Sequence, residues 1–267
     1  MPRFAANLTM LYADLPLLER LERAAAAGFT GVEILFPYDE DPAVLRDTLQ
    51  RLNLELVLFN LPAGDFAAGE RGMANDPRRT DDFRAGVAQA LALAGTLGVT
   101  QLNCLVGRAL RDVPLEQQRD AIVTNLRYAA EQAAAAGVRI LIEPLNTIDT
   151  PGFMVSTTMH AEGVLAHVAH ENLSIQYDVY HAQRMEGNLV ETLTRGIAAG
   201  HIRHIQIADS PARNEPGTGE INYPFIFDAI DAAEYDGWVG CEYRPLTTTD
   251  AGLGWLVQER ERQITRG

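Results

Sequence analysis

Four apolar runs in the second half of the chain each end in a side chain that carries oxygen. Three of these side chains are carboxylates and one is an amide: Glu143, Asp178, Gln206 and Glu242. Consecutive members are separated by about one strand and one helix. If the runs are successive parallel strands of one barrel, their carboxyl ends meet at the same mouth. The sequence therefore predicts that the four side chains form one arc.

An arc that holds three carboxylates requires a positive charge. Carboxyl groups this close together repel one another and bind protons instead of staying ionised. A divalent cation removes that conflict, and a ligand set made of oxygens favours Mg²⁺ or Mn²⁺ over zinc or copper. Taken singly, an acid at a strand end is more often a solvated side chain or a helix cap, and a lone glutamine is uninformative. The same position in four successive units favours a metal site.

A repeat of strand and helix accounts for this spacing. The predicted strands are 4–8, 31–36, 55–61, 101–106, 138–143, 173–178, 202–208 and 238–242, and the predicted helices are 15–27, 42–52, 81–97, 115–136, 158–170, 188–199, 224–234 and 248–263. Eight such units in 267 residues are typical of a (β/α)₈ TIM barrel, here one domain spanning 1–267. A doubly wound open sheet is disfavoured, because no GxGxxG motif follows the first strand.

Two long segments without helical or strand pattern, 62–80 and 209–223, follow predicted strands. They are expected on the face where barrel enzymes keep their active sites. Each contains a glycine-rich stretch, AGERG at 68–72 and PGTG at 216–219, but neither has the lysine of a P-loop. We therefore predict lids over the mouth and not phosphate cradles.

The composition limits the partners and the compartment. A net charge of −14 argues against nucleic acid and anionic membranes, because phosphate binding needs clustered basic residues. No apolar run is long enough for a membrane helix, and the first residues lack the core of a signal peptide. Cys104 and Cys241 lie in strand-like runs and read as buried thiols of a cytoplasmic protein. The oligomeric state is left open, a homo-oligomer being one option.

Several motifs resemble those of the hydroxypyruvate isomerase family of xylose-isomerase-like barrels. They are NLPAGD at 60–65, AGERG at 68–72, IEP at 142–144, QYDVYH at 176–181, RMEG at 184–187, EPGTGEINY at 215–223 and GWVGCEY at 237–243. The likeness extends from residues 6–8 to the last predicted helix. It implies a TIM barrel whose divalent metal is held by the four strand-end residues named above.

The resemblance also implies an activity. Members interconvert hydroxypyruvate and tartronate semialdehyde, a step of glyoxylate metabolism, and Glu143 and Glu242 would move the protons through an enediolate. His181 and Arg213 match residues that touch substrate oxygens. A sister group that isomerises 2-oxo-tetronates shares these motifs, so the substrate stays open between the two.

A 2-oxo acid needs a cation to anchor its carboxylate. The arginines near the predicted mouth are Arg71, Arg108, Arg213 and Arg244, and a guanidinium fork suits a carboxylate. We favour Arg213 and Arg71 as substrate-binding residues. His204 lies two positions before Gln206, and we expect it to pack inside the barrel and not to bind metal.

These residues are consistent with three classes of protein. The first is the isomerase. The second is another metal-dependent barrel enzyme: a ketose 3-epimerase differs in the size of its substrate, and a phosphate-ester nuclease is disfavoured by the charge and by only six histidines. The third is a non-catalytic sugar-acid binding protein, for which we would expect a missing ligand, whereas all four are present.

Overall fold

Eight parallel strands close into a barrel in chain order. The structure, a computed structural model, describes residues 2–266. The strands are β1 (Arg3–Asn7), β2 (Gly31–Glu33), β3 (Glu55–Asn60), β4 (Gln101–Cys104), β5 (Arg139–Ile142), β6 (Leu173–Asp178), β7 (Ile202–Ile207) and β8 (Trp238–Cys241). β8 pairs with β1, with Ala6 beside Cys241, and so closes the sheet on itself. The predicted TIM barrel is confirmed.

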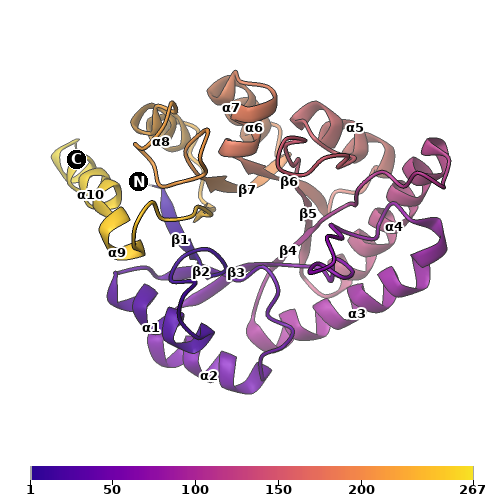
Figure 1. Ribbon diagram of the computed structural model, residues 1–267, viewed down its shortest axis with the longest axis horizontal. Coiled ribbons are helices and arrows are strands. Elements are labelled where there is room, and N and C mark those ends of the chain that lie inside the picture. The colour runs from indigo at the N-terminus through magenta and orange to yellow at the C-terminus, as the bar shows by residue number, and fades with distance from the viewer. Residues whose placement is uncertain (1, 267) are drawn as a thin grey trace.

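Helices surround the strands, and the chain runs once around the ring (Figure 1). They are α1 (Leu17–Ala26), α2 (Pro42–Leu52), α3 (Thr80–Leu97), α4 (Leu115–Ala135), α5 (Thr158–Val168), α6 (Val179–Met185), α7 (Leu189–Ala198), α8 (Tyr223–Ala232), α9 (Thr249–Gly252) and α10 (Gly254–Arg266), with a 3₁₀ turn at Pro77–Arg79. Within residues 2–266, none of them is both long enough and apolar enough to span a membrane.

The strands are mostly apolar because both of their faces are covered. Their side chains pack against the helices on one side and inside the barrel on the other, which is typical of parallel sheets. Local signals set the helix ends. At α2, for example, the Asp41 side chain accepts hydrogen bonds from the backbone of Ala43 and Val44, and Asn53 ends the helix in the left-handed conformation.

The prediction was wrong about several element boundaries. β2 and β4 are shorter than the predicted 31–36 and 101–106, and Glu143 and Glu242 stand just after their strands. Pro144 has no N–H to continue the ladder beyond β5. The predicted helix 248–263 is two helices, α9 and α10, which meet at Gly252 and Gly254, and glycine has a low helix propensity.

Helix α6 was not predicted. It begins directly after β6, without a loop, because the carboxylate of Asp178 accepts hydrogen bonds from the backbone N–H groups of Tyr180 and His181. A strand-end acid thus doubles as a helix cap. His181, expected just beyond the strand, therefore lies in the first turn of a helix, which fixes its position relative to Asp178.

Candidate active site

The carboxyl ends of β5 to β8 bring the four predicted ligands to one side of the barrel mouth. These strands are consecutive neighbours in the sheet, and Asp178 pairs with Gln206 in the ladder between β6 and β7. Glu143, Asp178, Gln206 and Glu242 are all at most 4% exposed. Parallel strands that end at a common edge account for this convergence.

Two of the carboxylates each have one buried oxygen that accepts no hydrogen bond within residues 2–266. Asn103 donates to Glu143 Oε2 at 3.0 Å, and the backbone of Tyr180 donates to Asp178 Oδ1 at 2.7 Å. Among the described residues, the other oxygens, Glu143 Oε1 and Asp178 Oδ2, are buried and lack a hydrogen-bond partner. Buried oxygens without a donor are costly, and a cation satisfies them. Atoms of Glu143, Asp178 and His181 lie within 4.8 Å of one another, and the two carboxylates of this cluster fit a divalent metal.

The other two predicted ligands are engaged by protein groups. Gln206 Oε1 accepts a hydrogen bond from Gln176 at 2.5 Å. Glu242 Oε2 forms an ion pair of 2.6 Å with Arg213 Nη2, and Asn7 Nδ2 lies 3.4 Å from its other oxygen. The structure thus brings the four residues together, with the charge of Glu242 already partly compensated by a guanidinium.

Arg213 places its guanidinium among the carboxylates. Its Nη2 is 2.6 Å from Glu242 and 3.5 Å from Asp178, and the guanidinium lies over the ring of Tyr180. Arg213 has a backbone φ of +60°, a conformation that residues other than glycine rarely adopt. Its backbone N–H donates to the carbonyl of Asp209, and its carbonyl accepts from Arg244 N. The loop therefore aims this arginine into the site.

Burial and mutual repulsion alter the acidity of the cluster. Burial, followed by the charges of Glu242 and Asp178, raises the pKa of Glu143 well above its usual value. Burial likewise raises the pKa of Asp178, and it raises the pKa of Glu242 to about 8 even though Arg213 opposes the shift. Carboxyl groups with raised pKa values can take up and release protons near neutral pH.

His181 is a neutral hydrogen-bond donor. Burial, together with the nearby charges of Arg213 and Arg184, holds the pKa of His181 well below its usual value. Its Nδ1 accepts a hydrogen bond of 3.1 Å from the backbone N–H of Asn146, so the ring proton is on Nε2. Nε2 lies 3.6 Å from Asp178 Oδ2, on the site.

The pKa of Glu242 predicts a pH dependence of stability for the metal-free protein. A carboxyl whose pKa is about 8 when folded and about 4.5 when unfolded binds a proton in the folded state only, so raising the pH through 8 lowers the free energy of unfolding. Above pH 7 His181 is neutral in both states and does not contribute. We expect the Tm to fall by on the order of 5 °C between pH 7 and pH 8.5, and Glu242→Gln to reduce that slope. A Tm that rises over this interval would contradict the assignment.

A pocket of about 570 Å³ opens above the carboxylates. Its floor contains Glu143, His181 and Glu242, and its walls combine arginines with apolar side chains: Arg71, Arg213, Arg244, Leu35, Phe66, Leu105 and Leu145. The two long loops, 62–80 and 209–223, each contribute an arginine to it. Acids below and cations at the side suit a small anionic substrate.

Arg71 has no carboxylate partner within the described part of the chain. Its Nη1 donates to the backbone carbonyls of Phe66 and Glu70 at 3.0 and 2.7 Å, and its guanidinium lies 3.7 Å from the centre of the Phe66 ring. The carboxylate of Glu70 instead pairs with Arg79. Burial, and then the charge of Arg108, lowers the pKa of Arg71. Its charge is therefore available to a ligand.

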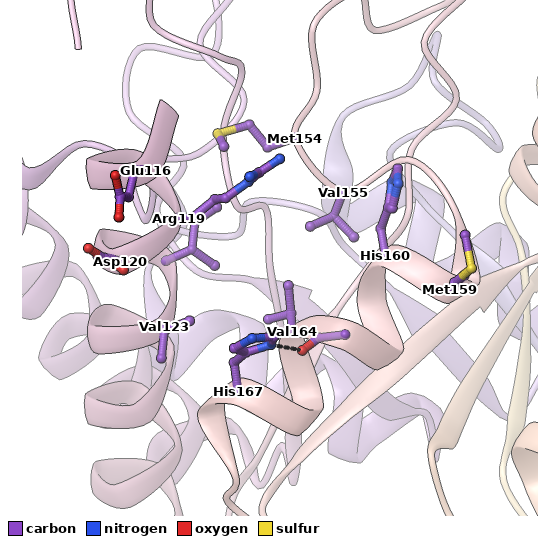
Figure 2. Close-up of a pocket in the computed structure, with 12 residues that line it drawn as sticks. Glu116, Arg119, Asp120, Val123, Met154, Val155, Met159, His160, Val164 and His167 are labelled. Atoms are coloured by element: carbon purple, nitrogen blue, oxygen red, sulfur yellow. Dashed lines mark hydrogen bonds between the residues drawn. The ribbon is translucent and has the colours of Figure 1, made fainter. Parts of the chain in front are cut away.

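A second pocket, of about 450 Å³, lies between α4 and α5 and contains none of the predicted site residues (Figure 2). Glu116 and Asp120 lie on α4, away from the histidines of α5, and His167 is hydrogen-bonded to the carbonyl of Gly163 in its own helix (Figure 2). The polar groups of this second pocket do not converge on a common point (Figure 2). The pocket at the barrel mouth is the candidate active site.

The sequence reasoning missed a buried polar layer next to the ligands: Asn7, Glu33, Asn103 and Gln176. The available signal was a polar residue inside an otherwise apolar strand, as in Val32-Glu33-Ile34. His204 is fully buried and hydrogen-bonded to Glu33, so the expectation that it packs inside the barrel is confirmed.

Fold and site together define the class: a TIM barrel with a buried acidic site at the carboxyl ends of its strands. Residues 21–259 match the family model described as xylose isomerase-like TIM barrel. The chain is 51% identical to a hydroxypyruvate isomerase of Escherichia coli K12 over 96% of this chain and 98% of that protein. It is 46% identical to a 2-oxo-tetronate isomerase of Cupriavidus necator, with the same coverage of both chains.

A solved structure shares the fold and much of the sequence. The crystal structure titled AP endonuclease, family 2, from Brucella melitensis superposes with a TM-score of 0.93 at 43% identity, over 97% of this chain and 99% of that one. The protein belongs to the hydroxypyruvate isomerase family of xylose isomerase-like TIM barrels, and it is an isomerase.

Proposed function

We propose that this protein interconverts hydroxypyruvate and tartronate semialdehyde with the help of a divalent cation, Mg²⁺ or Mn²⁺. The observation that carries the proposal is the floor of the mouth pocket, where two buried carboxyl groups, Glu143 and Glu242, have raised pKa values and face one cavity. The identity of 51% to a hydroxypyruvate isomerase supports the choice of substrate.

The reaction moves one hydrogen between neighbouring carbons. A base removes a proton from C3 of hydroxypyruvate, an enediolate forms, and an acid returns a proton to C2, while the C3 hydroxyl loses its proton and the C2 oxygen gains one. Glu143 and Glu242 would serve as base and acid, because burial raises the pKa of both, that of Glu242 to about 8, and a carboxyl group with a raised pKa can both accept and return a proton. The direction of the reaction decides which acts first.

Four residues would hold the cation: Glu143, Asp178, Gln206 and Glu242. When bound, a divalent cation supplies positive charge to substrate oxygens as negative charge develops on them. The buried oxygens of Glu143 and Asp178 that accept no hydrogen bond from the described part of the chain support this proposal. His181 would donate its Nε2 proton to a substrate oxygen, and Arg213 would hold a second oxygen while it keeps Glu242 in place.

Arg71 would anchor the substrate carboxylate. We expect Arg71→Ala to raise the KM for hydroxypyruvate by about 10- to 100-fold with a smaller change in kcat, because a charge-assisted hydrogen bond is lost. Arg46→Ala is the control, since Arg46 pairs with Asp47 on α2, far from the pocket lining. Steady-state kinetics of both variants measure this, and an unchanged KM for Arg71→Ala would remove Arg71 from the site.

The direct test follows hydroxypyruvate by proton NMR in D₂O, with metal-stripped protein and with added Mn²⁺ or Mg²⁺. Metal-dependent formation of tartronate semialdehyde, with deuterium at the reacting carbon, would support the proposal. Failure of protein that binds the metal to convert hydroxypyruvate would contradict it.

A 2-oxo-tetronate is the second candidate substrate. The pocket of about 570 Å³ has room for a longer acid than hydroxypyruvate, and a 2-oxo-tetronate isomerase is 46% identical to this chain. The ratio of kcat/KM for the two acids, measured on one preparation, decides between them.

A further inference from the structure

A buried acid that has no part in the proposed reaction lies inside the barrel, next to the candidate metal site. Glu33 ends β2 and is 0% exposed. Three side chains surround its carboxylate: His204 Nε2 at 2.6 Å from Oε1, and Gln206 Nε2 and Asn7 Nδ2 at 2.8 and 3.0 Å from Oε2. An acid buried this completely is retained only where it is well paired.

The backbone leaves room for this carboxylate. Asn7 pairs with Glu33 between β1 and β2, and Gln206 pairs with Gly240 between β7 and β8. A Cβ atom on Gly240 would lie only 2.0 Å from Glu33 Oε1. Glu33 therefore reaches across the position of Gly240 to contact Gln206, and any larger residue at 240 would close that path.

The Gln206 amide turns its nitrogen end toward Glu33. An ionised carboxylate only accepts hydrogen bonds, whereas an amide has a donating nitrogen and an accepting oxygen. Gln206 can approach Glu33 only with its nitrogen, so its Oε1 turns toward Gln176 on β6, the strand that ends in Asp178. One hydrogen bond from Gln176 leaves a second lone pair of this oxygen for a cation.

The remaining contacts of Glu33 hold this arrangement in place. Gln101 Nε2 lies 3.0 Å from His204 Nδ1, so that nitrogen accepts and the Nε2 proton of His204 points at Glu33. Asn7 Nδ2 lies between Glu33 and Glu242, 3.0 Å from the first and 3.4 Å from the second. The same acid thus links Gln206 and Glu242.

We propose that Glu33 is a positioning residue of the metal site: it orients the Gln206 amide so that an oxygen, and not an N–H group, faces the cation. This inference rests on the proposed function, because the cation belongs to that function. Residues that orient metal ligands in this way change metal affinity by about 10- to 100-fold when they are replaced.

The test measures Mn²⁺ binding to metal-stripped full-length protein by calorimetry. We expect Glu33→Gln, which keeps the side-chain shape, to weaken Mn²⁺ binding by about 10- to 100-fold, and Gln206→Ala to weaken it similarly. If Glu33 acts through Gln206, the double variant Glu33→Gln/Gln206→Ala should bind Mn²⁺ no more weakly than the single variant with the lower affinity. Glu55→Gln is the control, since Glu55 is exposed at the start of β3.

An exchange of the two side chains separates orientation from general stability. In Glu33→Gln/Gln206→Glu, the new amide can donate to the new carboxylate, which again offers an oxygen to Mn²⁺, so binding should recover. Gln206→Glu alone puts two acids in contact and should bind more weakly than the exchange variant. Circular dichroism and the Tm will show whether Glu33→Gln alone folds. If it does not, the comparison of Gln206→Glu with the exchange variant still tests the role of Glu33.

The outcomes distinguish this inference from the proposed function. Wild-type affinity in Glu33→Gln, or losses that add independently in the double variant, would overturn the role of Glu33. A wild-type protein that binds Mn²⁺ but does not convert hydroxypyruvate would overturn only the proposed function. A wild-type protein that binds no Mn²⁺ would overturn both the metal site and the role of Glu33 in it.

Discussion

Replacing Glu143 or Glu242 by glutamine is expected to lower kcat for hydroxypyruvate by about 10²- to 10⁴-fold in a protein that still folds. That range is typical of a lost general acid or base. Glutamine keeps the shape of the side chain but cannot take up or return the proton. Folding should persist because the replacement removes one of several mutually repelling acids, whose repulsion helps to raise the pKa of Glu143.

Deuterium exchange distinguishes the two roles. A variant that has lost the base for C3 should neither isomerise hydroxypyruvate nor exchange its C3 hydrogens with D₂O, whereas a variant that has lost only the acid for C2 can still exchange them. Glu131→Gln is the control, an exposed acid on α4 that should leave kcat unchanged. Near-normal kcat in both site variants would remove these residues from the proton transfers.

Metal removal should have the second large effect. Chelation is expected to reduce turnover on the order of 10³-fold, because several kcal/mol of charge stabilisation are lost, and Mn²⁺ or Mg²⁺ should restore it. The same addition should raise the Tm in a concentration-dependent way, since the cation binds the folded state. Restoration should be stronger at pH 8 than at pH 6, because the cation displaces protons from carboxyl groups such as Glu242, whose pKa is about 8.

Asp178→Asn provides the matched variant for metal binding. It keeps the side-chain shape but removes the charge of a carboxylate whose Oδ2 accepts no hydrogen bond among the described residues, although Arg213 Nη2 lies 3.5 Å from it. We expect weaker Mn²⁺ binding and a smaller rise in Tm. Full turnover by protein shown by elemental analysis to be free of metal would instead make Arg213, 2.6 Å from Glu242, the cation of the site.

The sequence by itself determined the barrel and the identity of the strand-end residues. Apolar runs at regular spacing are a local signal, and the carboxyl ends of parallel strands meet at one edge whatever the details of packing. Glu143, Asp178, Gln206 and Glu242 could be named for this reason before their distances were known. The helix cap formed by Asp178 also depends on local sequence only. Helix α6 was nevertheless not predicted, because Asp178 ends a strand and a strand end was not expected to start a helix.

Only the tertiary structure decided how these residues are paired. Glu33 and His204 are 171 positions apart in the chain, and Gln101 and His204 are 103 apart, so nothing in the local pattern of either strand predicts their contacts. Similarly, Arg213 forms an ion pair with Glu242, whereas Arg71 donates to backbone carbonyls and has no carboxylate partner among the described residues. Closure of the barrel brings such groups together. Because they are buried, no water can replace a missing partner, and each unpaired polar group or charge costs free energy of folding.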